Sequence, residues 1–234
     1  MNEMIKKLRY LKYYAKVLLN NWTVNKDSYA QHGEDKLVEQ LLPNGVNSFI
    51  DIGANDGVLF SNTYKFAKNG AMGLCLEPSP NAYKKLRLNH LIHPRIKCVQ
   101  CAVSNEIGQI FLKEDGYEQT LSKVCTEPVP GSFKISTVTF DHILKKYPNF
   151  INIDLLSIDV EGHEKNVLDG LTNDKFNAKL IIIESDKSGQ LEILKGNYIP
   201  YLTNGVNLVY VNKLFKLKDN FKLPYKYKFI KEAK

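Results

Sequence analysis

The sequence lacks a membrane-spanning segment, because no uninterrupted apolar run in its 234 residues reaches the roughly 18 positions that such a helix needs. Cysteine is also scarce: the chain has four, in apolar settings, which is too few for a disulfide framework. Nor is a secretory signal indicated, since Lys12 and Lys16 interrupt any apolar core near the N-terminus. The composition, with 44% apolar residues, is that of an ordinary globular protein. These features predict a reduced, cytosolic protein.

The body of the chain lacks the basic excess that is typical of nucleic-acid enzymes. The net charge of +7 comes from the two ends, since residues 1–26 carry six basic residues and one acidic residue, and residues 213–234 carry eight and two. The rest of the chain carries 18 basic and 22 acidic residues. We therefore expect no nucleic-acid partner. The basic ends favour an anionic surface such as a membrane leaflet, with solvated charged ends as the alternative.

Apolar residues near the N-terminus recur at three- and four-residue spacing, which predicts an amphipathic helix within residues 1–26. Lysines and an arginine project from its other faces, and its apolar side consists of Ile5, Leu8, Leu11, Ala15, Leu18, Leu19 and Trp22. A basic amphipathic helix with a tryptophan is typical of an interfacial membrane anchor. The alternative is that the apolar side packs on the domain or on a second subunit.

Residues 27–212 form the predicted domain. From Ser48 onward, short apolar runs alternate with helical patterns, which indicates a parallel sheet with crossover helices. The runs occupy residues 49–52, 73–77, 96–101, 155–159 and 180–184. Residues 114–136 show little periodicity, so we expect a long loop there. Thr139 is expected to cap a helix that begins at Phe140.

The last two predicted strands, residues 198–203 and 207–211, are joined by Asn204-Gly205, a strong β-hairpin signal. Pro200 cannot donate to a ladder, so its strand should lie at a sheet edge. A hairpin that closes a parallel sheet differs from the six-stranded dinucleotide fold. The sequence therefore predicts an α/β, Rossmann-like class I methyltransferase fold, with a mostly parallel seven-stranded sheet and a C-terminal antiparallel hairpin. Residues 213–234 are predicted to be a Lys-rich tail.

The first strand ends in the loop Asp51-Ile52-Gly53-Ala54-Asn55-Asp56-Gly57. Glycine lets the backbone turn tightly beside a ligand, and Glu77, after the second strand, is placed to accept from ribose hydroxyls. These features fit NAD and S-adenosylmethionine (SAM) alike. Asp51 and Asp56 distinguish them, because a carboxylate about 4 Å from a unit charge contributes roughly 4 kcal/mol at an effective dielectric of about 20. That energy favours the SAM cation and opposes a pyrophosphate. The alternative is an acidic turn that caps the next helix.

Five motifs follow one another in the sequence: SYAQHGED at 28–35, FIDIGANDG at 49–57, SNT at 61–63, EP at 77–78 and IDVEGHE at 158–164. Together they resemble the FkbM family of SAM-dependent methyltransferases, and the resemblance covers roughly residues 28–212. It implies a class I methyltransferase fold, SAM as the methyl donor, and O-methylation of hydroxyls, often on sugars.

The resemblance and the acidic loop together predict where the cofactor binds. The segment around Gln31 and Asp35 is expected to fold over the cofactor, Glu77 to bind its ribose, and Ala102 to lie near its adenine. The predicted cofactor-binding residues are Gln31, Asp35, Asp51, Gly53, Asn55, Asp56, Gly57, Glu77, Pro78 and Ala102.

The predicted fourth strand ends in Asp159-Val160-Glu161-Gly162-His163, where side chains face the ligand crevice of an open α/β sheet. Acids and a histidine suit the removal of a proton from a hydroxyl. Asp159 and His163 are the candidate bases, and Glu161 is a further candidate catalytic residue, with helix capping as its alternative. A divalent cation such as Mg²⁺ or Ca²⁺, held by Asp159 with Glu184 or Asp186, is the alternative to a base.

The sequence thus predicts a cytoplasmic, SAM-dependent O-methyltransferase that acts on a carbohydrate hydroxyl of a surface glycan or a glycosylated precursor. Peripheral membrane contact through the basic ends is part of this prediction. Two alternatives belong to other classes, a nucleic-acid methyltransferase and a non-catalytic membrane-associated protein that retains the fold. The acidic body and the missing amine-directed motif (Asn-Pro-Pro-Tyr-like) count against the first, and a failure to bind SAM would favour the second.

Overall fold

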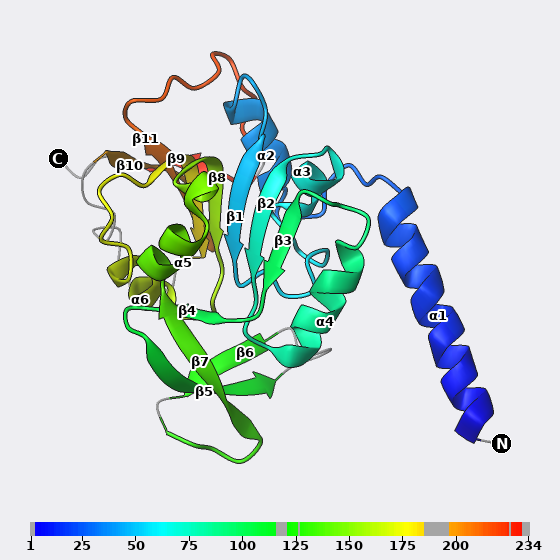
Figure 1. Cartoon of the computed structure of the whole chain (residues 1–234). Helices are drawn as coiled ribbons and strands as arrows, with labels where there is room; N and C mark the ends of the chain where they lie inside the picture. Colours follow the sequence, from blue (N-terminus) through cyan, green and yellow to red (C-terminus); the bar gives the residue numbers. More distant parts are fainter. Residues whose placement is uncertain (1–2, 116–120, 126, 185–196, 225, 231–234) are drawn as a thin grey trace.

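The computed structural model describes residues 3–115, 121–125, 127–184, 197–224 and 226–230. Within them, a central eight-stranded sheet is flanked by helices on both faces, and a smaller four-stranded sheet lies at one end of it (Figure 1). In the described part of the chain, no helix is both long and apolar enough to cross a membrane.

Five strands of the central sheet are parallel and lie in the order β3-β2-β1-β8-β9. They span Ser48–Ile52 (β1), Met72–Leu76 (β2), Ile96–Val99 (β3), Asn152–Ile158 (β8) and Asn177–Glu184 (β9). Three antiparallel strands extend the sheet beyond β9, in the order β11, β10 and β12. They span Tyr198–Thr203 (β10), Asn207–Asn212 (β11) and Lys228–Phe229 (β12). The predicted mostly parallel sheet with a C-terminal hairpin is confirmed, with β12 as an additional short strand.

Pro200 lies in β10, which is not the edge strand that we expected. β12 pairs with β10 only at Leu202 and Thr203, and the register of β10 against β11 shifts between Pro200 and Leu202. The missing N–H of Pro200 is tolerated because the short β12 ends before it reaches that residue.

The alternation of side chains along β1 places one apolar cluster on each face of the sheet. Phe49 packs with residues of α2, α3 and α4, whereas Ile50 and Ile52 pack with residues of α5 and α6. The helices span Glu34–Leu41 (α2), Tyr64–Lys68 (α3), Pro80–Asn89 (α4), Phe140–Lys146 (α5) and Glu164–Asp169 (α6), and a 3-10 helix follows α5 at Pro148–Phe150 (η2). The predicted Thr139 cap is confirmed, since its side chain accepts from the His142 N–H.

The prediction of a long loop over residues 114–136 is wrong. This stretch contributes to a second sheet of order β4-β7-β5-β6. Its strands are Ala102–Ser104 (β4), Gly108–Asp115 (β5), Leu121–Cys125 (β6) and Ser132–Thr139 (β7). An antiparallel sheet with one solvated face needs no continuous apolar run, so the charged residues within it hid the strands.

The described part of the Lys-rich C-terminal segment, residues 213–224 and 226–230, packs on the domain. Phe215, Leu217, Phe221 and Leu223 contact the cluster formed with α2, α3 and α4, and Tyr227 is buried in it. Lysines at the intervening positions 216, 218 and 222 are exposed. The alternation of apolar residues and lysines therefore reflects an amphipathic segment, which the charge count alone did not reveal.

Candidate active site

A cavity of about 280 Å³ lies at the carboxyl ends of β1, β2, β8 and β9. Because these parallel strands end at the same edge, residues more than a hundred positions apart in the sequence meet there. Gln31, Asp51, Gly53, Asn55, Glu77, Pro78, Ala102, Asp159, Glu161 and His163, all predicted site residues, line it. Asp35, Asp56 and Gly57 do not.

Gly53 allows the loop after β1 to pass close to β8. Its φ of +85° is in the left-handed region, and a Cβ on this residue would lie 1.7 Å from the carbonyl oxygen of Asp159. The N–H groups of Gly53 and Ala54 donate to the Leu76 carbonyl oxygen, which ties the loop to β2 (2.9 and 3.1 Å). No residue with a side chain fits this turn without displacing the backbone of β8.

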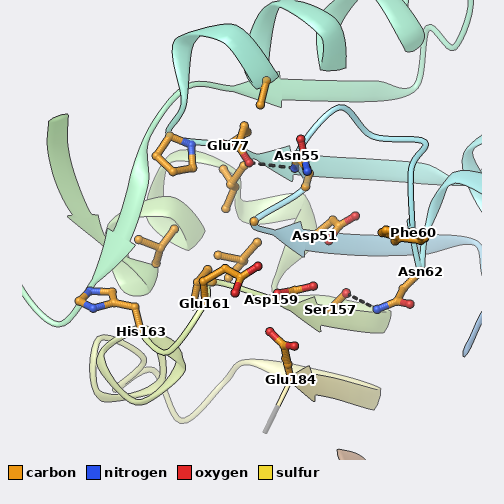
Figure 2. Close-up of a pocket in the computed structure, with 18 of the residues that line it drawn as sticks. Asp51, Asn55, Phe60, Asn62, Glu77, Ser157, Asp159, Glu161, His163 and Glu184 are labelled. Atoms are coloured by element: carbon orange, nitrogen blue, oxygen red, sulfur yellow. Dashed lines mark hydrogen bonds between the residues drawn. The ribbon is translucent and has the colours of Figure 1, made fainter. Parts of the chain in front are cut away.

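Glu77 is a buried carboxylate held at the cavity wall. Its Oε2 accepts from the Asn55 N–H (2.8 Å, Figure 2), and its Oε1 accepts from the Ser79 N–H (2.8 Å). Burial raises the pKa of Glu77 from 4.5 to about 7, against the lowering effect of these two backbone hydrogen bonds. The two N–H donors fix the carboxylate in place, ready to accept from a ligand hydroxyl.

Of the two loop acids expected to face the cofactor, Asp51 lines the cavity. Its Oδ2 accepts from Thr63 Oγ1 (2.6 Å), Ser157 is a second hydrogen-bond partner, and burial raises its pKa to about 6. The placement of Asp56 in the binding set is wrong, because its Oδ1 accepts from the N–H groups of Val58 and Leu59 (2.8 Å each) within its own turn.

Asp35 and Gly57, also predicted to bind the cofactor, make contacts within the protein. Asp35 accepts from the Tyr29 N–H (2.8 Å) and from Ser28 Oγ (2.5 Å), so it orders the segment that carries Gln31. Gly57 packs against α4, where a Cβ would lie 2.6 Å from Leu86 Cδ1 and 2.8 Å from His90 Nε2. Both residues support the loops around the cavity without lining it.

Three carboxylates gather where β8 and β9 end. Asp159, Glu161 and Glu184 each present an oxygen within 4.8 Å of the others, and Figure 2 shows all three side by side. Burial, followed by the neighbouring Glu184 carboxyl, raises the pKa of Asp159 well above its usual range. The set is suited to accepting a proton, and its oxygen donors are of the type that Mg²⁺ or Ca²⁺ binds. Asp186, the other predicted metal ligand, lies outside the described residues.

His163 stands apart from this carboxylate cluster (Figure 2). Its Nε2 lies 3.0 Å from Ser104 Oγ, and the Ser104 hydroxyl donates to Asn105 Oδ1 (3.0 Å). Burial lowers the pKa of His163, so the ring is neutral at physiological pH.

Three further residues line the cavity, and of these only Asn62 belongs to a motif recognised in the sequence, SNT at 61–63. Phe60 has a φ of +57°, rare for an aromatic residue, and it is 56% exposed at the cavity. Asn62 donates to Ser157 Oγ (3.2 Å), and Asn207 donates to the buried Glu34 (2.7 Å) from the C-terminal hairpin. No local pattern indicates that Asn207 reaches this cavity, because only the order of the strands brings β11 near it.

The second sheet supplies an apolar wall of the cavity through Ile110, Leu112 and Val124. Its strand β5 is joined to the start of α4, since Glu114 accepts from Ser79 Oγ and from Asn81 Nδ2 (3.1 Å). The cavity therefore has an apolar end beside Glu77 and a polar end beside Asn62 and Glu184, as expected for a ligand with both a planar base and charged groups.

The sequence and the fold are similar to those of known methyltransferases. The model of the methyltransferase FkbM domain matches residues 51–195. No curated protein matches the chain. Among solved structures, the chain is similar to precorrin-6y C5,15-methyltransferase from Geobacter metallireducens (TM-score 0.47, 11% identity, 81% of this chain and 93% of that one). It is also similar to a methyltransferase from Geobacter sulfurreducens (TM-score 0.44, 11% identity, 86% of this chain and 88% of that one). Because the domain match covers more than half of the sequence, the chain belongs to the FkbM methyltransferase family, and it is a SAM-dependent methyltransferase.

Proposed function

We propose that this methyltransferase transfers the methyl group of SAM to a hydroxyl of a carbohydrate. SAM, when bound, supplies a methyl group on a positively charged sulfur. Glu77 is placed to accept from the ribose hydroxyls, and the apolar wall formed by Ile110, Leu112 and Val124 is suited to the adenine. The carboxylates of Asp51, Asp159 and Glu184 give the rest of the cavity the negative charge that suits a sulfonium.

The carboxylate cluster supports a hydroxyl as the acceptor. An alcohol is a weak nucleophile until it loses its proton, and Asp159, with its raised pKa, is the better matched base among the cavity acids. In the proposed step the acceptor oxygen forms the new O–CH₃ bond, the S–CH₃ bond breaks, and the hydroxyl proton passes to Asp159. His163, neutral and set apart, is placed to hold the acceptor by a hydrogen bond.

Phe60 is the observation that carries the carbohydrate assignment. A bulky side chain held at φ +57° and left 56% exposed costs stability, and such strain is found where a ligand uses the side chain. The apolar face of a sugar ring packs on an aromatic ring, while its hydroxyls need amide and carboxylate partners. Gln31, Asn62 and Asn207 provide the amides along the same cavity.

Replacing Phe60 by alanine is expected to raise the KM for the acceptor by about tenfold or more, because the sugar loses its apolar contact. Since alanine keeps the same backbone strain, kcat and the affinity for SAM should change little. Phe229→Ala is the matched control, because Phe229 is 54% exposed and lies outside the cavity. Equal KM values for Phe60→Ala and the parent enzyme would remove Phe60 from the acceptor site.

The acceptor class is tested by measuring transfer of radiolabelled methyl from SAM to oligosaccharides, to single-stranded RNA and DNA, and to a catechol. We expect labelled product with oligosaccharides and, on hydrolysis, an O-methyl sugar. Transfer only to nucleic acid or to the catechol would refute the proposal. Repeating the assay with EDTA and then with Mg²⁺ distinguishes Asp159 acting as the base from a divalent cation held by the three carboxylates.

A second proposal concerns the cellular compartment in which the enzyme works. Cys75, Cys98 and Cys101 are free thiols, and Cys75 is fully buried. Free thiols in the core support a reducing compartment, so we propose that the enzyme works in the cytoplasm.

Binding of the cofactor is expected to depend on pH through Glu77. Because the pKa of this acid is raised to about 7, the folded protein holds the Glu77 proton more tightly than the unfolded chain does between pH 4.5 and 7. The stability due to this group is therefore lost as the pH rises through that range, and a ligand that bonds to the ionised carboxylate restores it. S-adenosylhomocysteine should raise Tm more at pH 8 than at pH 6, as measured by differential scanning fluorimetry. In Glu77→Gln the Tm increase should be small and equal at both values, and a parent enzyme with equal increases would contradict the assignment.

A further inference from the structure

The long helix α1 (Glu3–Thr23) is fixed to the domain at its C-terminal end. Trp22 Nε1 donates to the Asn89 carbonyl oxygen (3.0 Å), and Asn21 Nδ2 donates to Asn89 Oδ1 (3.1 Å). Lys68 Nζ donates to the carbonyl oxygens of Asn21, Trp22 and Val24 at 2.8 to 3.0 Å, which caps the helix end. The last turn is thus part of the domain, next to the end of α4.

The rest of α1 projects away from the body of the molecule (Figure 1). Ala15 and Leu19, which belong to the apolar side of the helix, are exposed, Leu19 to 57%. Tyr13 is 68% exposed, and the exposed Lys12 and Lys16 lie seven and three positions before Leu19, on the same side of the helix. Above the last turn, among the side chains that the structure describes, Ala15 and Leu19 of the apolar side are therefore left uncovered, whereas Leu18 is half-buried.

The charged residues of α1 are mostly basic. The helix contains Lys6, Lys7, Arg9, Lys12 and Lys16 but only one acid, Glu3. Lys12 and Lys16 are four residues apart and therefore repel each other on one face. An anionic surface relieves this repulsion, and exposed Leu19 and Tyr13 can enter the boundary between headgroups and acyl chains.

We propose that α1 binds the surface of a phospholipid bilayer that contains anionic lipids. A second copy of the helix would bring like charges together, and nucleic acid would leave the leucine and tyrosine without an apolar partner. The lysines of the C-terminal segment do not belong to the same surface, because β12 lies at one edge of the central sheet and β3, beside α4, lies at the other.

The direction of α1 links its contact with the bilayer to the methylation of a carbohydrate, and this link rests on the proposed function. The free end of the helix lies on the side of the molecule where β1, β2 and β3 end, which is the side of the cavity (Figure 1). A bilayer bound by α1 would lie near the cavity, as required for a carbohydrate acceptor that is carried on a membrane lipid.

Flotation of the full chain with vesicles tests the proposal without using enzyme activity. We expect the chain to float with vesicles of phosphatidylglycerol and phosphatidylcholine in equal parts, to stay behind with phosphatidylcholine alone, and to be released by salt. The double variant Lys12→Glu/Lys16→Glu should bind about tenfold less or weaker still. The control Lys216→Glu/Lys218→Glu makes the same change in net charge at the other sheet edge and should bind as the parent does.

Circular dichroism and binding of S-adenosylhomocysteine show whether each variant is folded. Equal flotation of the parent and Lys12→Glu/Lys16→Glu would overturn the proposal, as would binding to both kinds of vesicle alike. The proposal would also be overturned if the parent chain failed to float and instead dimerised through α1. Such a dimer would be seen as a molecular mass that halves when residues 1–20 are removed. These results are independent of the acceptor assay, because methyl transfer to an acceptor in solution depends on the cavity and not on α1.

Discussion

Replacing Asp159 by asparagine is expected to lower kcat by about 10²- to 10⁴-fold, because the amide cannot accept the proton of the acceptor hydroxyl. The affinity for S-adenosylhomocysteine should change little, since Glu77 and the apolar wall remain intact. In the parent enzyme kcat should rise with pH as Asp159 ionises, because burial and Glu184 raise the pKa of its carboxyl. Initial rates of methyl transfer across a pH series, with calorimetric titration of the cofactor, measure both effects.

Asp56→Asn is the matched control for this carboxylate-to-amide change. Asp56 accepts from two N–H groups of its own turn, and an asparagine Oδ1 can accept the same two bonds. Both kcat and cofactor affinity should therefore stay close to the parent values. If Asp159→Asn turned over as fast as Asp56→Asn, Asp159 would not be the base, and the proton would have to pass to another group.

Gly53→Ala is expected to destabilise the fold by about 3 kcal/mol or more and to abolish measurable cofactor binding. The new Cβ would lie 1.7 Å from the Asp159 carbonyl oxygen, so either the loop after β1 or the end of β8 must move. Both carry cavity residues, which is why binding should fail together with stability. Urea denaturation and calorimetric titration with S-adenosylhomocysteine measure the two losses.

Gly70→Ala separates the backbone cost from the clash. Gly70 has a φ of +86°, nearly that of Gly53, but a Cβ there would meet nothing within 4 Å. Its expected cost is about 1 to 2 kcal/mol, with cofactor binding unchanged. Equal losses of stability in the two variants, or full cofactor affinity in Gly53→Ala, would show that the close approach of the loop to β8 is not required.

The sequence was most informative where a buried strand runs directly into the site. Asp51, Gly53, Glu77 and Asp159 could be placed because each follows or ends an apolar run, and parallel strands bring such ends to one edge. The C-terminal hairpin was predictable for a similar local reason, since Asn204-Gly205 specifies a tight turn between two strands.

The direction in which a loop side chain points could not be predicted in this way. Asp51 and Asp56 have the same chemistry and bracket the same turn, yet one faces the cavity and the other accepts from its own loop. The turn geometry decides between them, and that geometry depends on Gly57 packing against α4. The acidic character of the cavity comes from Asp51 together with Asp159, Glu161 and Glu184, and the last three gather only in the folded chain.

Phe60 and the second sheet were missed for another reason. Nothing in the local sequence shows that Phe60 adopts a positive φ, since that value is imposed by the surrounding loops. The strands of the second sheet lack continuous apolar runs and contain charged residues, so pairing with neighbouring strands orders them. Both features shape the cavity, and both follow from tertiary contacts.

A crystal structure of the full chain with S-adenosylhomocysteine bound is the most direct test of the cofactor site. The ligand should lie in the cavity at the ends of β1, β2 and β8, with its ribose hydroxyls on the Glu77 carboxylate and its adenine against Ile110 and Leu112. A complex in which the ligand lies elsewhere, or in which Glu77 makes no contact with it, would contradict the assignment of this cavity to SAM.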